Sequence, residues 1–143
     1  MKLCMIGTGY VGLVTGTCFA ELGNTVHCVD KDVSKINLLN KCEIPIYEPG
    51  LNELVKKNFL QNRLIFTNNI KLAIKNSDII FICVGTPTNK KTNSANLKYV
   101  YNATKEISKY INKYKIIVNK STVPVLTGDK IEKLIKKNIK MLM

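Results

Sequence analysis

The chain has 143 residues, of which 45% are hydrophobic and 22% charged, with a mean hydropathy of +0.01. These values describe one globular domain, and no run approaches the roughly 18 apolar residues that a membrane-spanning helix needs. The formal charge is +12, but Arg63 is the only arginine. Because arginine is the residue best suited to bidentate phosphate and base contacts, we expect no nucleic-acid partner.

Short apolar runs alternate with segments of helical periodicity through the first half of the chain. Strands are predicted at residues 2–6, 25–29 and 64–67, and helices at 10–22, 33–39, 49–60 and 69–76, with a loop at 40–50. In the first helix Val11, Val14, Cys18 and Leu22 recur near helical spacing, and Gly23 ends it. Pro49 is expected to open the helix that follows the loop.

The second half continues the alternation with a wholly apolar strand at residues 79–84. A strand that is apolar on both faces belongs in the middle of a parallel sheet covered by helices. A polar loop is predicted at 86–96, a helix at 97–112 with Asn96 as its N-cap, a strand at 116–119, a turn at 121–124 and a helix at 125–138. Residues 139–143 are expected to begin a further strand. This order predicts an α/β fold with a doubly wound parallel sheet, incomplete at its C-terminal end.

A glycine-rich turn, Gly7-Thr8-Gly9-Tyr10-Val11-Gly12, joins the first predicted strand to the first predicted helix. G-x-G-x-x-G in this context, with an acid at the end of the second strand, is typical of a Rossmann-like dinucleotide-binding domain. Gly7 permits the tight turn, Gly9 lets the backbone approach a pyrophosphate, and Gly12 lets the helix pack closely on the sheet. The alternative is a glycine-rich turn that binds nothing.

Asp30, at the end of the second predicted strand, indicates which cofactor is bound. A carboxylate there accepts hydrogen bonds from the adenosine ribose and repels a 2′-phosphate, which favours NAD over NADP. Lys31 and Lys35 are close in sequence and could hold a 2′-phosphate, so NADP stays open as an alternative cofactor. Flavin is a second alternative.

The cysteines and the histidine give no metal or disulfide pattern. There are five cysteines, an odd number without a C-x-x-C pair, and one histidine, His27. Cys4, Cys18, Cys28 and Cys83 fall in apolar segments and are expected at core positions, whereas Cys42 falls in a loop. The first residues reach glycine too early for the core of a signal peptide. We therefore expect a cytoplasmic protein with no metal site, no disulfide framework and no membrane contact.

Beyond the glycine loop, the chain resembles the UDP-glucose/GDP-mannose dehydrogenase family from residue 1 to about residue 137. The matching segments include GTGYVGLVTG at 7–16, CFAELG at 18–23, VD at 29–30, IPIYEPGL at 44–51, VGTP at 84–87 and KSTVPV at 120–125. The resemblance implies an oxidoreductase that takes the primary alcohol of a nucleotide sugar to a carboxylate with two NAD and one water. A cysteine thiolate captures the intermediate aldehyde in that family.

The resemblance also implies roles for individual residues. The implied cofactor-binding residues are Gly7, Gly9, Tyr10, Val11, Gly12, Asp30, Lys35, Thr86 and Thr122. Thr122 matches a threonine that the family places close to the chemistry, so it is also the implied catalytic residue, orienting water. The resemblance implies a nucleotide sugar as the small-molecule substrate, and these motifs favour UDP-glucose over UDP-N-acetylmannosamine and GDP-mannose. It also implies that the full-length enzyme is a homodimer.

Two departures from the family pattern change what is expected. Leu126 stands where the family has glycine, and leucine does not adopt a positive φ cheaply, so the last helix is expected to shift its start if the glycine needs one. None of the five cysteines matches the family's nucleophile. We therefore expect residues 1–143 to be the NAD-binding part of a longer enzyme, inactive alone. The alternatives are another Rossmann hydroxyacid-type dehydrogenase, and a non-catalytic NAD-binding or basic interaction module.

Overall fold

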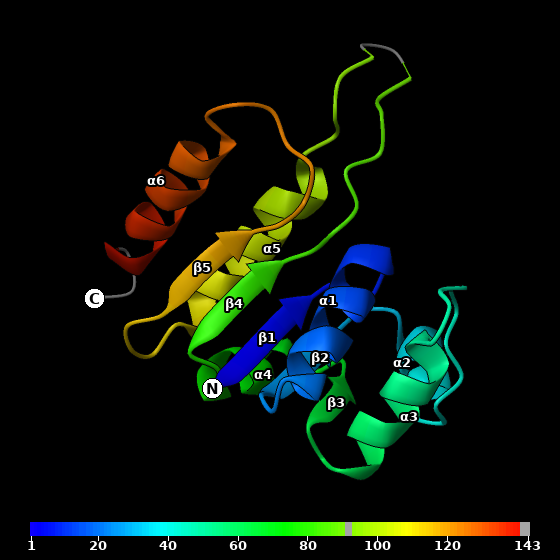
Figure 1. Cartoon of the computed structure of the whole chain (residues 1–143). Coiled ribbons are helices and arrows are strands. Elements are labelled where there is room, and N and C mark those ends of the chain that lie inside the picture. Colours follow the sequence, from blue (N-terminus) through cyan, green and yellow to red (C-terminus); the bar gives the residue numbers. More distant parts are fainter. Residues whose placement is uncertain (91–92, 141–143) are drawn as a thin grey trace.

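The computed structural model describes residues 1–90 and 93–140. Within them the strands are β1 (Lys2–Ile6), β2 (Thr25–Val29), β3 (Leu64–Thr67), β4 (Ile79–Ile82) and β5 (Ile116–Asn119). All pairings are parallel, and the strand order is β3-β2-β1-β4-β5 (Figure 1). The predicted doubly wound parallel sheet is confirmed, and the direction of the strand order reverses between β1 and β4.

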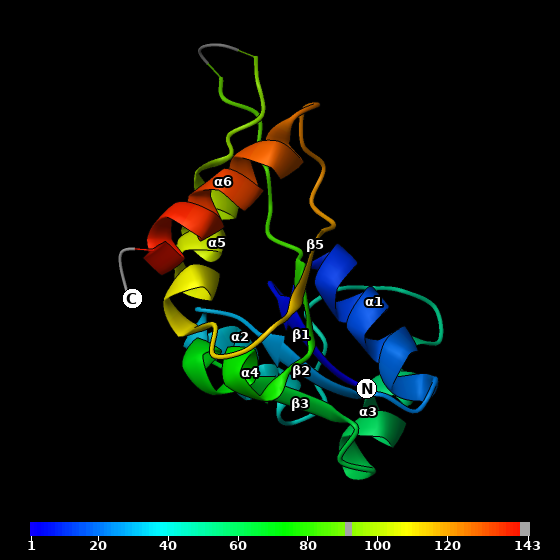
Figure 2. The same cartoon turned by 90° about the vertical axis from the view of Figure 1, so that its left-hand side faces the viewer.

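The helices cover both faces of the sheet, as Figure 2 shows. Helices α1 (Tyr10–Glu21), α2 (Val33–Leu39) and α3 (Leu51–Leu60) pack on one face, and α4 (Ile70–Asn76), α5 (Lys98–Tyr110) and α6 (Thr127–Lys140) on the other. The order of strands and helices is therefore the predicted one. Among the described residues, no helix has the length and apolar character needed to cross a bilayer.

Side chains alternate between the two faces along each strand and divide the core into two clusters. Leu3 and Met5 of β1 face α1–α3, whereas Ile80 and Ile82 of β4 are fully buried against α4–α6. Phe81, on the other face of β4, packs against the first cluster. The apolar strand thus contacts a core cluster on each face, fully buried at Ile80 and Ile82 and partly buried at Ile79 and Phe81. Each fully buried isoleucine contributes roughly 1.5–3 kcal/mol.

Of the four residues that gave α1 its predicted periodicity, only Val14 packs against the core, and the other three are exposed. Cys18 is exposed, and Leu22 just beyond the helix is 77% exposed, whereas Leu13, Thr17 and Ala20 are buried. The reason is the close packing of α1 on the sheet: a Cβ at Gly16 would lie 2.8 Å from the Sγ of Cys28. The helix therefore approaches the sheet closely at Gly16, and its buried face carries Leu13, Thr17 and Ala20.

Four helix starts differ from the predictions. Helix α4 begins at Ile70 because Asn69 is its N-cap, and the other three change because loop residues take turn conformations. Helix α3 begins at Leu51, not Pro49, since Gly50 is its N-cap with φ +76°. Helix α5 has Leu97 as its N-cap, and the Asn96 side chain instead accepts a hydrogen bond from the Lys98 amide at 3.0 Å.

The start of α6 has moved two residues along the chain, to Thr127. Leu126 adopts φ +67°, the left-handed conformation that disfavours leucine. The Thr127 hydroxyl donates to the Pro124 carbonyl at 2.7 Å and closes this turn. Residues 139–140, predicted as the beginning of a strand, continue α6, and the rest of that predicted strand, 141–143, lies outside the described residues.

Candidate dinucleotide-binding site

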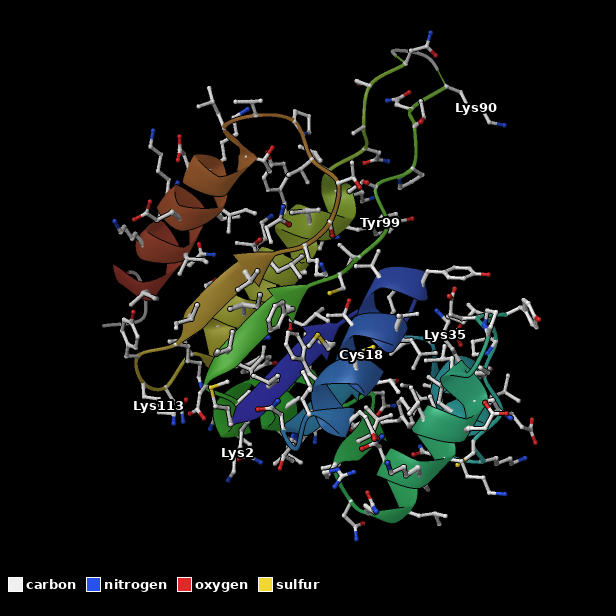
Figure 3. All side chains as sticks on the ribbon, viewed as in Figure 1. Lys2, Cys18, Lys35, Lys90, Tyr99 and Lys113 are labelled. Carbon is white, nitrogen blue, oxygen red and sulfur yellow. The ribbon has the colours of Figure 1, made fainter. Side chains whose placement is uncertain are left out.

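A cleft of about 600 Å³ opens at the carboxyl ends of β1, β2 and β4, where the strand order reverses. Its floor contains Gly7 and Gly9 after β1, and Gly85 after β4. Figure 3 labels two lining residues, Lys35 on α2 and Tyr99 on α5, which belong to helices on opposite faces of the sheet. In open α/β sheets this crevice is the usual place for a ligand.

The three glycines of the turn have different structural reasons to be glycine. Gly7 has φ +104°, and a Cβ there would lie 2.7 Å from the Cys83 carbonyl oxygen. A Cβ at Gly12 would lie 1.8 Å from the Gly7 carbonyl oxygen, so Gly12 allows α1 to contact the turn. The φ of Gly7 agrees with its predicted role in a tight turn, and a Cβ at Gly12 would also lie 3.1 Å from the Cβ of Cys83 after β4, in agreement with close packing of α1 on the sheet.

Gly9 differs from the other two because nothing in the folded chain forbids a side chain there. Its φ is −76°, and no heavy atom lies within 4 Å of an added Cβ. Gly9 is the N-cap of α1 and supplies no side chain to cap the first amides of the helix. The backbone at the positive end of α1 is therefore open toward the cleft, an arrangement suited to an anion such as a diphosphate.

Asp30 is held in place by four donors. Its Oδ2 accepts hydrogen bonds from the Thr8 amide (3.0 Å), the Thr8 hydroxyl (2.8 Å) and Lys35 Nζ (3.1 Å), and its Oδ1 accepts one from the Asp32 amide (3.1 Å). Burial acts to raise the pKa of Asp30, but the bonds from Thr8, Asp32 and Lys35 outweigh it and lower the pKa below the usual value. The site therefore presents an oriented carboxylate.

Thr8 is a site residue that the sequence reasoning missed. It lies between two glycines of the motif, is fully buried, and supplies two of the four bonds to Asp30. Thr8 could have been found from the sequence, because it carries a hydroxyl and lies in the turn after the first strand, beside the end of the second strand, where Asp30 follows.

Lys31 and Tyr99 form a second contact inside the cleft that the sequence did not predict. The Lys31 ammonium lies 5.1 Å from the centroid of the Tyr99 ring, and both residues line the cleft. This distance is within the range of a cation–π interaction. Asn102 and Glu106, further along α5, line the same side.

Of the nine residues assigned to the cofactor, Gly7, Gly9, Asp30 and Lys35 line the cleft. Gly12 lies buried behind the turn, and Tyr10 and Val11 are exposed at the start of α1. Thr86 and Thr122 follow β4 and β5 on the same edge of the sheet, Thr86 partly buried and Thr122 exposed, outside the residues that line the cleft.

A hydrogen bond ties together the loops that carry these two threonines. The Ser121 hydroxyl donates to the carbonyl of Val84 at 2.7 Å, and the Ser121 amide donates to the carbonyl of Ile82 at 3.1 Å. Val84 itself lines the cleft. The position of Thr122 is therefore linked to the wall of the cleft through its neighbour in the chain.

The cysteines do not form a thiolate site in the cleft. Cys83 lines it, but burial raises the pKa of Cys83 to about 11. Burial also raises the pKa of Cys4 to about 12 and raises that of Cys28. The exception to the predicted core positions is Cys18, which is exposed because it lies outside the buried face of α1 that Leu13, Thr17 and Ala20 form. Within residues 1–90 and 93–140, no group of acidic, histidine and cysteine side chains is arranged to hold a metal.

The comparisons with known proteins agree with this geometry. Residues 1–142 match the model of the UDP-glucose/GDP-mannose dehydrogenase family, NAD binding domain. UDP-glucose 6-dehydrogenase TuaD of Bacillus subtilis is 59% identical over 136 residues, which is 95% of this chain and 29% of that protein. The UDP-glucose 6-dehydrogenase of Rhizobium meliloti is 52% identical over 136 residues, 95% of this chain and 31% of that protein.

A solved structure extends the agreement to three dimensions. The GDP-mannose dehydrogenase of Pseudomonas aeruginosa, in a ternary complex, superposes with a TM-score of 0.92 at 35% identity, over 98% of this chain and 33% of that one. The chain thus spans about a third or less of the length of these relatives. It belongs to the UDP-glucose/GDP-mannose dehydrogenase family and corresponds to the NAD binding domain of that family.

Proposed function

We propose that this chain is the NAD-binding part of a UDP-glucose 6-dehydrogenase, which converts UDP-glucose, two NAD and water to UDP-glucuronate and two NADH. Relatives at 59% and 52% identity carry that name. The GDP-mannose dehydrogenase shares the fold at only 35% identity, so the fold alone does not select the sugar. The higher identity is what favours UDP-glucose over GDP-mannose and UDP-N-acetylmannosamine.

The observation that carries the proposal is the open turn at Gly9 beside the oriented carboxylate of Asp30. The residues fit NAD: the uncapped start of α1 suits the diphosphate, and a carboxylate suits the hydroxyls of the adenosine ribose. Lys35 shares the ribose with Asp30, while Tyr10 and Val11 border the diphosphate. When bound, NAD supplies the hydride acceptor.

NAD is favoured over NADP because of the charge at the ribose position. Asp30 has a lowered pKa and is ionised at neutral pH, so it repels a 2′-phosphate. Lys35, the nearest cation, is already paired with Asp30 at 3.1 Å. This pairing leaves Lys35 poorly placed to compensate for a second anion.

We assign the two threonines to the far side of the cofactor. Thr86 and Thr122 follow β4 and β5 at the carboxyl edge of the sheet. Thr86 contacts the cofactor, and the hydroxyl of Thr122 orients the water that completes the oxidation. This chain alone is inactive, because the one cysteine that lines the cleft, among the described residues, is a buried thiol with a pKa raised to about 11.

The same proposal includes the setting of the enzyme. Five cysteines without a disulfide among them suit a reducing compartment such as the cytoplasm. The full-length enzyme is a homodimer, as the family resemblance implies, and its partner is the nucleotide sugar rather than a nucleic acid. The described lysines include four in ion pairs with acids of this chain, at Lys35, Lys57, Lys113 and Lys136, which reduces the charge free for phosphates.

Calorimetric titration of the chain with NADH, NAD and NADPH tests the proposal. We expect NADH and NAD to bind, NADPH to bind at least tenfold more weakly, and no NADH to form when NAD and UDP-glucose are supplied together. Asp30→Asn should weaken NADH binding roughly 10- to 150-fold, the loss associated with a hydrogen bond to a charged group.

Asp78→Asn is the matched control. Asp78 pairs with Lys113 at 2.7 Å at the amino ends of the strands, the opposite end of the sheet from the cleft (Figure 3). Its substitution should leave NADH affinity unchanged. Equal loss of affinity in both variants, or no NADH binding by folded protein, contradicts the proposed site. Turnover of UDP-glucose by this chain contradicts its assignment as the inactive cofactor-binding part.

A further inference from the structure

Lys31 and Tyr99 meet inside the cleft next to Asp30. Lys31 directly follows Asp30 after β2, and Tyr99 lies in the first turn of α5. The Lys31 ammonium lies 5.1 Å from the centroid of the Tyr99 ring. Tyr99 is 41% exposed, so part of its surface is accessible from solvent.

The position of this pair matters for the proposed cofactor, on which the inference rests. Asp30 binds the adenosine ribose in the proposed function, and the adenine base is attached to that ribose by a single bond. The base must therefore lie next to Asp30, where Lys31 and Tyr99 line the cleft. Tyr99 is the aromatic residue among the described residues of the cleft lining, and aromatic rings are favoured surfaces for stacking a base.

We propose that Lys31 covers the face of Tyr99 on which adenine stacks, so that the Lys31 side chain competes with the adenine of the cofactor for this ring. Cofactor binding then releases the Lys31 side chain from the ring. Two observations favour competition over cooperation. The nearest carboxylate, Asp30, is already bound by Thr8 and Lys35. Within the described part of the chain no acid forms an ion pair with Lys31, so the ring contact holds its ammonium.

The expected effects of substitution have opposite signs. Lys31→Ala removes the competitor, and because an exposed cation–π contact is weak, affinity for the adenine moiety should rise about two- to fivefold. Tyr99→Leu removes the stacking surface and should lower the affinity about five- to 150-fold. In Tyr99→Leu, further replacement of Lys31 by Ala should produce no gain in affinity, because the contact that it relieves is already absent.

The experiment is a calorimetric titration of each variant with NADH and with adenosine. Adenosine is uncharged, so its affinity reports the competition without the attraction between a lysine and a diphosphate. Lys109→Ala is the matched control, because the Lys109 ammonium lies 5.0 Å from the ring centroid of Tyr110 at the other end of the same helix, away from the cleft. This control should leave both affinities unchanged.

Nicotinamide mononucleotide serves as the ligand control, since it lacks the adenine and should bind wild type and Tyr99→Leu equally. Weaker or unchanged adenosine binding in Lys31→Ala, while wild type binds NADH, overturns the inference and leaves the proposed function intact. Failure of wild type to bind NADH overturns the proposed function and the inference together. A gain in adenosine affinity in Lys31→Ala that disappears in the Tyr99→Leu background supports the inference.

Discussion

Gly9 and Gly12 allow the requirements of folding to be separated from those of binding, although both belong to one motif. At Gly9 an added Cβ meets no heavy atom within 4 Å, and φ is −76°, a value open to alanine. At Gly12 an added Cβ would lie 1.8 Å from the Gly7 carbonyl oxygen, a backbone atom that cannot rotate away. We therefore predict that Gly9→Ala impairs binding and Gly12→Ala impairs folding.

The magnitudes follow from these surroundings. Gly9→Ala stabilises the folded state by roughly 0.4–1 kcal/mol, because alanine lowers the conformational entropy of the unfolded chain. Alanine is a poorer N-cap than glycine, which costs a similar amount, so the free energy of unfolding should stay within about 0.5 kcal/mol of wild type. The new methyl stands where the diphosphate approaches the start of α1, and loss of one charge-assisted hydrogen bond weakens NADH binding roughly 10- to 150-fold. Gly12→Ala forces α1 away from the turn and should lower the free energy of unfolding by about 1–3 kcal/mol or more.

Urea denaturation followed by circular dichroism measures the first quantity, and calorimetric titration with NADH measures the second. Gly128→Ala is the control, since an added Cβ at Gly128 in α6 also has no heavy atom within 4 Å. It should leave the NADH affinity unchanged. The reasoning is refuted if Gly9→Ala loses as much stability as Gly12→Ala, or if it binds NADH as tightly as wild type.

Three further predictions concern the same edge of the sheet and its neighbours. Thr8→Val removes a buried bond to the Asp30 carboxylate and should cost about 1.5–3 kcal/mol at pH 7 by urea denaturation. The pKa of Asp30 is lowered from 3.8 in the folded chain, so the stabilisation that its ionised carboxylate gives is present above pH 3.8 and is lost as the pH falls below that value. The difference in free energy of unfolding between wild type and Thr8→Val should therefore shrink below pH 3.8. A difference that stays constant from about pH 7 to about pH 2 would contradict this expectation. Leu126→Gly relieves a positive φ worth about 1–2 kcal/mol against a glycine entropy cost of about 0.5–1 kcal/mol. Urea denaturation should therefore show a gain of up to about 1.5 kcal/mol, whereas Leu126→Ala should show none. Maleimide labelling of native protein should modify exposed Cys18 before buried Cys83, because the raised pKa of Cys83 disfavours its thiolate. Peptide mass spectrometry measures the order of labelling. Faster labelling of Cys83 would contradict its burial.

The fold was predictable because its information is local. The apolar run at 79–84 and the alternation of strand and helix patterns indicate a covered parallel sheet, and these features are present in the structure. The glycine motif and Asp30 likewise predicted the place of the site. The exposure of Val11, Cys18 and Leu22 was not predicted, because the pattern of large side chains does not show how closely a helix with Gly12 and Gly16 approaches a sheet.

The remaining parts of the site depend on contacts between distant segments. The bond from Thr8 to Asp30 requires β1 and β2 to be neighbours, and the contact of Lys31 with Tyr99 requires α5 to reach the end of β2. Neither the order of strands nor the rotation of α5 about its axis is encoded in a single motif. The sequence raised the question of a positive φ at Leu126 but did not predict that leucine would adopt it, in a turn that the Thr127 hydroxyl closes.

The hydrogen bond from Ser121 to Val84 joins the segment after β5 to the segment after β4. Displacement of the chain around Thr122 pulls on the carbonyl of Val84, which lines the cleft. The hydrogen bond therefore holds the segment before Thr122 against the wall of the cleft in the folded chain. Ser121→Ala would remove this side-chain bond, while the backbone bonds from the Lys120 and Ser121 amides to the Ile82 carbonyl would still join the two segments.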